Sequence, residues 1–195
     1  MESIAMPTVN ESTAPPVITV FGSSSPRTPL AYRQAAAAIG AGIAQQGWIL
    51  RNGAGADGCM GASTDAALAA GGRVQGVNLQ YFVDQGFVHP QLHDMRVAAT
   101  MRERKQLLGA DCAAYVILPG GPGTWEELWE VAVERQIGVH DKPLLCCDVD
   151  GFWQGFASTL QRAEGEGLLY GPARELLQWY PSPEACMARL QELLA

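Results

Sequence analysis

The stretch AAYVILPGGPGTWEE, residues 113–127, carries the strongest structural signal in the chain. Its first part, residues 113–118, is an apolar run of the length and composition typical of a buried β-strand. Glycines and prolines at 119–123 end the strand, and the residues from Trp125 to about Ile137 are predicted to form a helix. The order of strand, glycine-rich turn and helix predicts one unit of an α/β fold.

The same order recurs on both sides of this stretch. Further strands are predicted at residues 17–21, 48–50, 74–79 and 143–147, and further helices at 30–46, 60–70, 95–108, 152–166 and 183–194. Residues 80–93 carry mixed signals and are predicted to be irregular. Because the strands do not alternate between apolar and polar residues, we expect a Rossmann-like, doubly wound parallel sheet with helices on both faces. We expect a single domain over residues 17–195.

The start of the chain and its overall composition limit the possible environments and partners. Residues 1–16 are polar and proline-rich without the pattern of a signal peptide, so we expect a disordered tail. No apolar run approaches the roughly 20 residues that cross a bilayer. The net charge of −7 argues against nucleic acid and anionic membranes as partners. A small phosphorylated ligand remains compatible, because a local pocket can be positive on an acidic protein.

The cysteines and histidines show no metal-binding or redox pattern. No pair of cysteines has CxxC spacing, and we expect all five to be buried free thiols: Cys59, Cys112, Cys146, Cys147 and Cys186. This composition indicates a reducing compartment, and we expect a cytoplasmic protein. The three histidines lack a ligand spacing such as HExxH, so we expect no metal site.

Glycine-rich turns follow three of the predicted strands, at Gly22, Gly53 and Gly120. The carboxyl ends of parallel strands meet at one edge of a sheet, where ligands bind in such folds, so we expect the three turns to lie together. The stretch after Gly120 lacks the lysine of a Walker loop and the spacing of GxGxxG.

The start of the helix after Gly120 has the features of a phosphate site. Gly121 and Gly123 let the backbone approach a ligand, and the helix start presents unpaired N–H groups and a positive dipole end. Thr124 adds a hydroxyl donor. An alternative is a capping box, in which Thr124 caps the helix and Glu127 returns to the cap N–H.

A charged stretch in the predicted helix 95–108 is the second candidate feature. Met101, Arg104, Lys105 and Leu108 share one face at helical spacing, so the two cations lie beside apolar residues and we expect them to face the ligand edge. The alternative is a solvated helix face, which is the usual meaning of such a charge run.

These motifs resemble a known family. The pattern PGGxGTxxE at 119–127 is similar to the signature of the LONELY GUY (LOG) phosphoribohydrolases, long mislabelled lysine decarboxylases, and MxxRK at 101–105 is similar to their upstream motif. The similarity runs from about residue 17 to the C-terminus and includes FGSS (21–24), NGAG (52–55), GCMG (58–61), QIGVHDKP (136–143) and DVDGF (148–152). The chain departs from the family at Asn52, Ala54, Cys59, Arg102 and the pair Val133-Glu134. The last pair leaves the preferred base open, because we expect it near the base or sugar pocket.

The resemblance implies hydrolysis of the N-glycosidic bond of a cytokinin or purine nucleoside 5′-monophosphate, giving free base and ribose 5-phosphate. It implies that the Glu127 carboxylate stabilises the oxocarbenium-like sugar and orients or deprotonates the attacking water. Arg104 would hold the phosphate or offset charge on the departing base. Neither a metal nor an organic cofactor is implied.

The resemblance also implies the residues that contact the substrate and an assembly. Contacts are expected at Ser23, Gly53, Met101, Lys105, Gly120, Gly121, Gly123 and Thr124, with Glu130 as a second carboxylate. The family forms homodimers whose active site lies near the interface. Two other functions stay open: a nucleotide or cofactor carrier without turnover, and hydrolysis of a different nucleotide. A pyridoxal-phosphate decarboxylase is rejected, because it would need a larger fold and the chain offers only Lys105 and Lys142.

Overall fold

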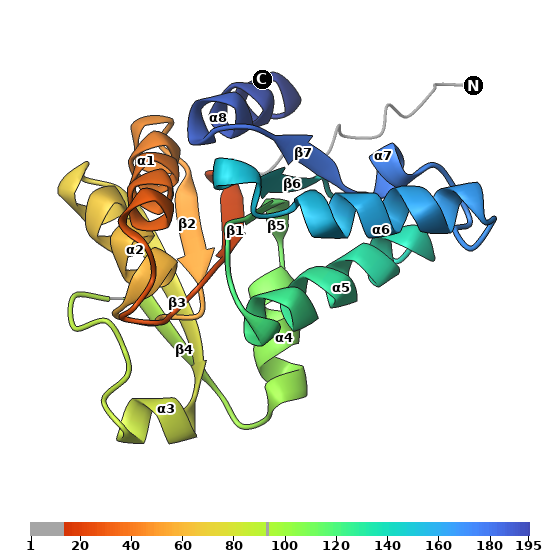
Figure 1. Cartoon of the computed structure of the whole chain (residues 1–195). Coiled ribbons are helices and arrows are strands. Elements are labelled where there is room, and N and C mark those ends of the chain that lie inside the picture. The colour runs from red at the N-terminus through yellow and green to blue at the C-terminus, as the bar shows by residue number, and fades with distance from the viewer. Residues whose placement is uncertain (1–13, 93) are drawn as a thin grey trace, which may run out of the picture.

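The computed structural model describes residues 14–92 and 94–195, which form a seven-stranded parallel sheet (Figure 1). The strands are β1 (Val17–Phe21), β2 (Ile49–Asn52), β3 (Arg73–Leu79), β4 (Asp94–Ala98), β5 (Cys112–Ile117), β6 (Leu144–Cys147) and β7 (Gln178–Tyr180). Their order across the sheet is β4-β3-β2-β1-β5-β6-β7. The chain order reverses beside β1, which lies between β2 and β5 and is therefore the switch point where such folds bind ligands.

Helices cover both faces of this sheet, which confirms the Rossmann-like, doubly wound fold predicted from the sequence. They are α1 (Leu30–Gln45), α2 (Gly58–Ala69), α3 (Gln80–Asp84), α4 (Met101–Gly109), α5 (Pro122–Gln136), α6 (Gln154–Gly165), α7 (Ala173–Leu176) and α8 (Pro183–Leu193), with a 3₁₀ turn at Val149–Gly151. Helices α1, α2 and α8 pack on one face, and α4, α5, α6 and α7 pack on the other (Figure 1).

The two cores are separated by the sheet itself. In β1, Ile18 and Val20 point into the core beneath α1 and α8, whereas Phe21 packs with Tyr115 of β5 in the core beneath α5 and α6. Both faces of the central strands are thus apolar, which explains why the sequence shows no alternation there. The five cysteines all lie buried as free thiols within these layers, as predicted.

Two edge regions differ from the sequence prediction. Residues 94–98 form strand β4, although 95–98 were predicted as the start of a helix over 95–108, and the helix begins only at Met101. Strand β4 pairs with β3 alone and its Val97 is exposed, so it lacks the continuous apolar pattern of an inner strand. Residues 80–84, within the stretch predicted to be irregular, form α3, and the short elements α7 and β7 were also missed.

The predicted N-terminal tail falls mostly outside the described part of the chain. Its last residue, Pro16, accepts a hydrogen bond from the Ile49 N–H at 2.8 Å, so the fold begins beside β2. Among residues 14–92 and 94–195, no helix combines the length and the apolar character needed to cross a membrane.

Candidate active site

The three glycine-rich turns lie together at the carboxyl edge of the sheet, as the sequence predicts. The Ser23 N–H after β1 donates to the Pro119 carbonyl after β5 at 3.1 Å. The Cys59 N–H at the start of α2 donates to the Ser23 carbonyl at 2.7 Å. Backbone hydrogen bonds therefore join the turns that follow β1, β2 and β5 into one surface.

The start of α5 leaves backbone donors available at this edge. Gly121 is the N-cap residue and its cap has no side-chain hydrogen bond, while Pro122 occupies the first helical turn. The first hydrogen bond of the helix runs from the Trp125 N–H to the Gly121 carbonyl, so the N–H groups of Gly123 and Thr124 precede the bonded part of the helix. Such donors at a positive dipole end suit an anion.

The capping-box alternative is wrong. Thr124 lies inside the helix and is buried, and Gly121 takes the cap position instead. A Cβ atom on Gly120 would collide with the Thr124 side chain, so the turn requires glycine there to let Thr124 pack. The Glu127 carboxylate binds a partner on another helix rather than the cap N–H.

That partner is Arg104 of α4. Its Nη1 atom lies 2.9 Å from Oε1 of Glu127, and the two side chains are 9% and 6% exposed. Burial raises the pKa of the Glu127 carboxyl, and the neighbouring Arg104 charge opposes that rise. A solvated helix face is therefore the wrong interpretation for Arg104, although it holds for the exposed Arg102 on the same helix.

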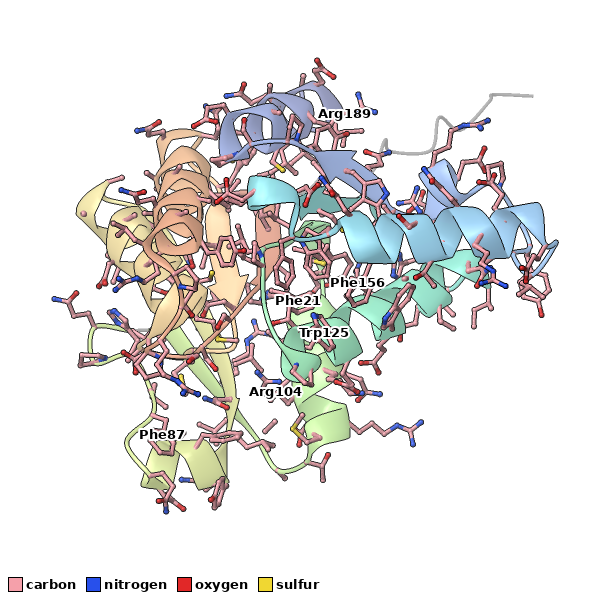
Figure 2. The ribbon with its side chains drawn as sticks, in the orientation of Figure 1. Phe21, Phe87, Arg104, Trp125, Phe156 and Arg189 are labelled. Carbon is pink, nitrogen blue, oxygen red and sulfur yellow. The ribbon has the colours of Figure 1, made fainter. Side chains whose placement is uncertain are left out.

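Arg104 also borders a cavity. Its Nε atom is buried and has no hydrogen-bond partner among the described residues. A Cβ atom on Gly53 would lie 2.5 Å from Arg104 Nη2, so any larger residue there would push against the guanidinium. The cavity measures about 380 Å³ and is lined by Ser24, Pro26, Gly53, Gly55, Ala56, Asp57, Met60, Asn78, Phe82, Gly86, Phe87 and Arg104. In Figure 2, Phe87, beyond α3, and Arg104 both lie toward the lower end of the view, and both line this cavity.

A second hollow of about 340 Å³ adjoins the first turn on its other side. It is bordered by Ser23 and Gly120, together with Arg27, Tyr32 and Phe152. The Ser23 hydroxyl lies 2.8 Å from the Thr28 hydroxyl, which fixes its position beside Gly120. Ser23 therefore borders this hollow together with Gly120, which precedes α5.

The remaining predicted site residues lie further out. The Lys105 ammonium pairs with Glu126 at 2.6 Å and with Glu130 at 3.0 Å. Lys105 and Glu130 therefore face each other across the surface and do not point into the cavity beside Arg104. Met101, in the first turn of α4, is 46% exposed. The structure thus brings Arg104 and Glu127 together with the three turns, and places Met101, Lys105 and Glu130 at the rim.

Val133 and Glu134 do not line the cavity beside Arg104. Val133 is half exposed on the outer side of α5, and Glu134 lies near His140. A larger cavity of about 610 Å³ lies at that end of α5, bordered by His140 and Tyr170, and contains none of the predicted site residues. Within one chain, these two departures from the family pattern are therefore remote from the cavity.

Sequence reasoning missed several residues that shape the cavity. The Asn52 side chain accepts from the Ala54 N–H at 2.9 Å and donates to the Thr64 hydroxyl at 3.0 Å, which fixes the second turn against α2. Asn78 and Phe82 line the cavity from β3 and α3. Asn52 was visible as a departure from the family pattern, but the segment after β3 carried no signal.

Comparison with known proteins identifies the family. The family model described as "Possible lysine decarboxylase" matches residues 60–190. The probable cytokinin riboside 5′-monophosphate phosphoribohydrolase LOGL5 of Oryza sativa subsp. japonica is 31% identical over 175 residues, which cover 90% of this chain and 71% of that protein. The chain belongs to the LOG family. The cytokinin riboside 5′-monophosphate phosphoribohydrolase LOG3 of Arabidopsis thaliana is also 31% identical over 175 residues, covering 90% of this LOG-family chain and 81% of its own length.

Solved structures share the fold of this LOG-family chain. A molybdenum cofactor binding protein from Rippkaea orientalis superposes with a TM-score of 0.74 at 19% identity, covering 94% of this chain and all of the other. The molybdenum cofactor carrier protein of Chlamydomonas reinhardtii has a TM-score of 0.69 at 22% identity, with 93% and 99% covered. These likenesses support the α/β architecture alone.

Proposed function

We propose that this protein hydrolyses the N-glycosidic bond of a purine or cytokinin nucleoside 5′-monophosphate, releasing the free base and ribose 5-phosphate. The observation that carries the proposal is the buried pair of Arg104 and Glu127 beside the glycine-rich turns. A nucleotide carrier needs phosphate donors and a base pocket, but it has no need of a buried carboxylate next to the sugar. The activities named for the plant relatives support the same reaction class.

The 5′-phosphate is proposed to bind at the start of α5. The N–H groups of Gly121, Gly123 and Thr124, the Thr124 hydroxyl and the Ser23 hydroxyl are donors of the kind that phosphate oxygens accept. A nucleoside would leave these donors without a partner, so we expect monophosphates to be preferred. The cavity of about 380 Å³, with Phe82 and Phe87 at its border, would take the base.

The chemical step follows from the charges around the sugar. As the bond between C1′ and the base nitrogen breaks, its electron pair leaves with the base and positive charge develops on the sugar ring. The Glu127 carboxylate stabilises that cation and accepts a proton from the attacking water, whose oxygen bonds to C1′. The proton then passes to the departing base, so that the products are neutral base and ribose 5-phosphate. Arg104 offsets negative charge on the phosphate or on the departing base.

Burial suits Glu127 to this role. A carboxyl whose pKa lies above the ordinary value is a stronger base than an exposed glutamate, and the neighbouring Arg104 charge opposes that rise and so favours the ionised form. The unpartnered Arg104 Nε is a further donor for a substrate oxygen. Binding of the nucleotide would therefore satisfy a buried group that has no partner among residues 14–92 and 94–195.

We further propose a cytoplasmic homodimer with its active site near the subunit interface. Three exposed apolar residues cluster at the end of α5, namely Val133, Ile137 and Val139. An exposed apolar cluster of this kind is typical of a contact between subunits. Five buried free thiols fit a reducing compartment.

The deciding experiment is to incubate the protein with AMP and with isopentenyladenosine monophosphate, and to measure free base by chromatography. Adenosine is the control. Release from either monophosphate but not from adenosine is the expected result, and the ratio of the two rates gives the preferred base. AMP binding without release from either monophosphate would instead favour a carrier or a different nucleotide substrate.

A further inference from the structure

The C-terminal end of α4 is held by side chains from several other elements. A helix leaves its last four carbonyls without partners inside the helix. In α4, each carbonyl from Leu107 to Ala110 accepts a hydrogen bond from a side chain elsewhere in the fold. We call this set of donors, Thr19, Arg51, Cys112 and Lys142, the α4 clamp.

Arg51 of β2 is the centre of the α4 clamp. It is 2% exposed, and its Nη1 atom donates to the carbonyls of Leu107, at 3.3 Å, and Ala110. Its Nε and Nη2 atoms donate to the Gln75 side chain at 3.0 and 2.8 Å, and Gln75 donates in turn to Asp94 at 2.8 Å. Burying a guanidinium is costly unless its donors are satisfied, and here the helix end and the Gln75 side chain satisfy them together.

The other donors all come from the β1 side of Arg51 in the sheet. The Thr19 hydroxyl of β1 donates to the Leu108 carbonyl at 2.7 Å, and the Lys142 ammonium, just before β6, donates to the Gly109 carbonyl at 2.6 Å. The Cys112 thiol also donates to the Gly109 carbonyl at 3.4 Å. Two of the four donors are cations, which favour the negative end of the helix dipole.

The clamp matters because α4 is short and carries Arg104. A helix of nine residues is too short to be stable alone, so tertiary contacts must fix where it lies. Its start is fixed by Thr100, whose hydroxyl accepts from the Glu103 N–H at 3.1 Å. Arg104 lies one turn before the clamped carbonyls, and its guanidinium must meet Glu127 on α5.

We propose that Arg51 is a positioning residue, which sets the place of Arg104 relative to Glu127 by holding the end of α4. Arg51 touches neither the cavity lining nor the Glu127 carboxylate, and it acts through the helix. The proposal rests on the proposed function only for its effect on catalysis, since the placement of Arg104 can be measured without turnover.

The first readout is the titration of the Glu127 carboxyl, followed by NMR of ¹³C-labelled glutamate and assigned with Glu127→Gln. The charged groups that face Glu127 are Arg104 from α4 and Glu126 and Glu130 from its own helix, and of these Arg104 is the one that lowers its pKa. Displacing Arg104 should therefore move the titration to higher pH.

The first variant is Arg51→Met, whose side chain has a length similar to arginine but no hydrogen-bond donors. The second is Thr19→Val, a near-isosteric change that removes only the hydrogen bond to the Leu108 carbonyl. It is used if Arg51→Met is too unstable to fold. Both should shift the Glu127 titration upward by at least about half a pH unit, in the direction of Arg104→Ala. Arg51→Lys, which keeps the charge, should recover part of the shift. Leu190→Ala, in the opposite core, is the control for lost stability alone and should leave the titration unchanged.

The second readout is base release from AMP. We expect kcat to fall by roughly tenfold in Arg51→Met, because small displacements of a catalytic group have large effects, while KM changes by less than about threefold. A Glu127 titration and kcat like those of the wild type in Arg51→Met, or in Thr19→Val where Arg51→Met does not fold, would overturn the proposal. If the wild type releases no base, the proposed function fails, and the titration still decides whether Arg51 positions Arg104.

Discussion

Arg104 and Glu127, 23 positions apart in the chain, meet at 2.9 Å with both side chains buried. The pair joins α4 to α5 at the edge of the sheet where the turns after β1, β2 and β5 converge. A buried ion pair contributes little to stability compared with apolar packing, because desolvation offsets the attraction. Its position beside a cavity and a row of backbone donors therefore points to chemistry.

Glu127→Gln should lower the turnover of AMP by at least about a hundredfold, because the amide can neither accept a proton nor stabilise the sugar cation. AMP should still bind, since the donors at the start of α5 are unchanged. Chromatography measures the first effect and calorimetry the second. Glu126→Gln, at the neighbouring exposed position, is the control and should keep its activity. Turnover of Glu127→Gln like that of the wild type would remove Glu127 from the mechanism.

Arg104→Ala should lower activity by about a hundredfold or more, which is typical for loss of one charge-stabilising donor. It should also lower the melting temperature, because Glu127 is left buried without its partner. Arg102→Ala changes an exposed arginine of the same helix and should affect neither quantity. Equal activities of the two variants would mean that the charges of α4 serve only as a solvated face.

The pH dependence of kcat should report the buried carboxyl. In the proposed mechanism the ionised form of Glu127 is the active one, so activity should be lost as the pH falls through its pKa. Because burial raises that pKa, the loss should begin above the range of an exposed glutamate, whose pKa is about 4.3. Initial rates at saturating AMP between pH 4 and 9 would measure the acidic limb. A limb at or below the ordinary value would contradict the role of Glu127 as a base.

Gly53→Ala should reduce kcat/KM by about tenfold or more, because the new methyl group would displace the Arg104 guanidinium that it meets at 2.5 Å. The matched control is Gly155→Ala in α6, where an added Cβ meets nothing within 4 Å. That change should leave activity intact and slightly raise the melting temperature, since alanine favours a helix over glycine. Steady-state kinetics and thermal unfolding of both variants test this, and equal kinetics would refute it.

The proposed dimer should depend on the exposed end of α5. Ile137→Asp, at a position 63% exposed, should convert a dimer into a monomer in sedimentation experiments, because a charge cannot be buried between subunits without a partner. Leu168→Asp introduces the same charge at another exposed apolar residue and should leave the assembly unchanged. A wild-type protein that sediments as a monomer would refute the dimer directly.

The sequence predicted the inner strands and the three turns well, because these segments carry their signal locally. Residues 113–118 are apolar throughout, and β5 occupies nearly the same span. The edge strand β4 was missed because Val97 continues the helical row of Met101 and Leu108, and only pairing with β3 makes the segment a strand. Local patterns decide inner strands, whereas edge strands depend on their neighbours.

The candidate site was predicted only where residues belong to motifs. The family resemblance implied a role for both Arg104 and Glu127, and the structure brings their side chains into contact. Arg51 could not be predicted, because its partners lie 24 to 59 positions away and no local pattern marks them. Lys105 shares a helical face with Arg104, but the position of Glu126 and Glu130 on α5 decides where its ammonium lies.

The place of β1 in the middle of the sheet has a consequence for how the protein folds. Val17 pairs on one side with Ile49 and on the other with Cys112, so the first strand gains its second neighbour only after more than half of the chain has been synthesised. Pairings between such distant segments slow folding. The sheet edge where we propose that phosphate binds is therefore completed late, and a nucleotide that binds there should stabilise only the finished protein, slowing its unfolding and leaving its folding rate unchanged.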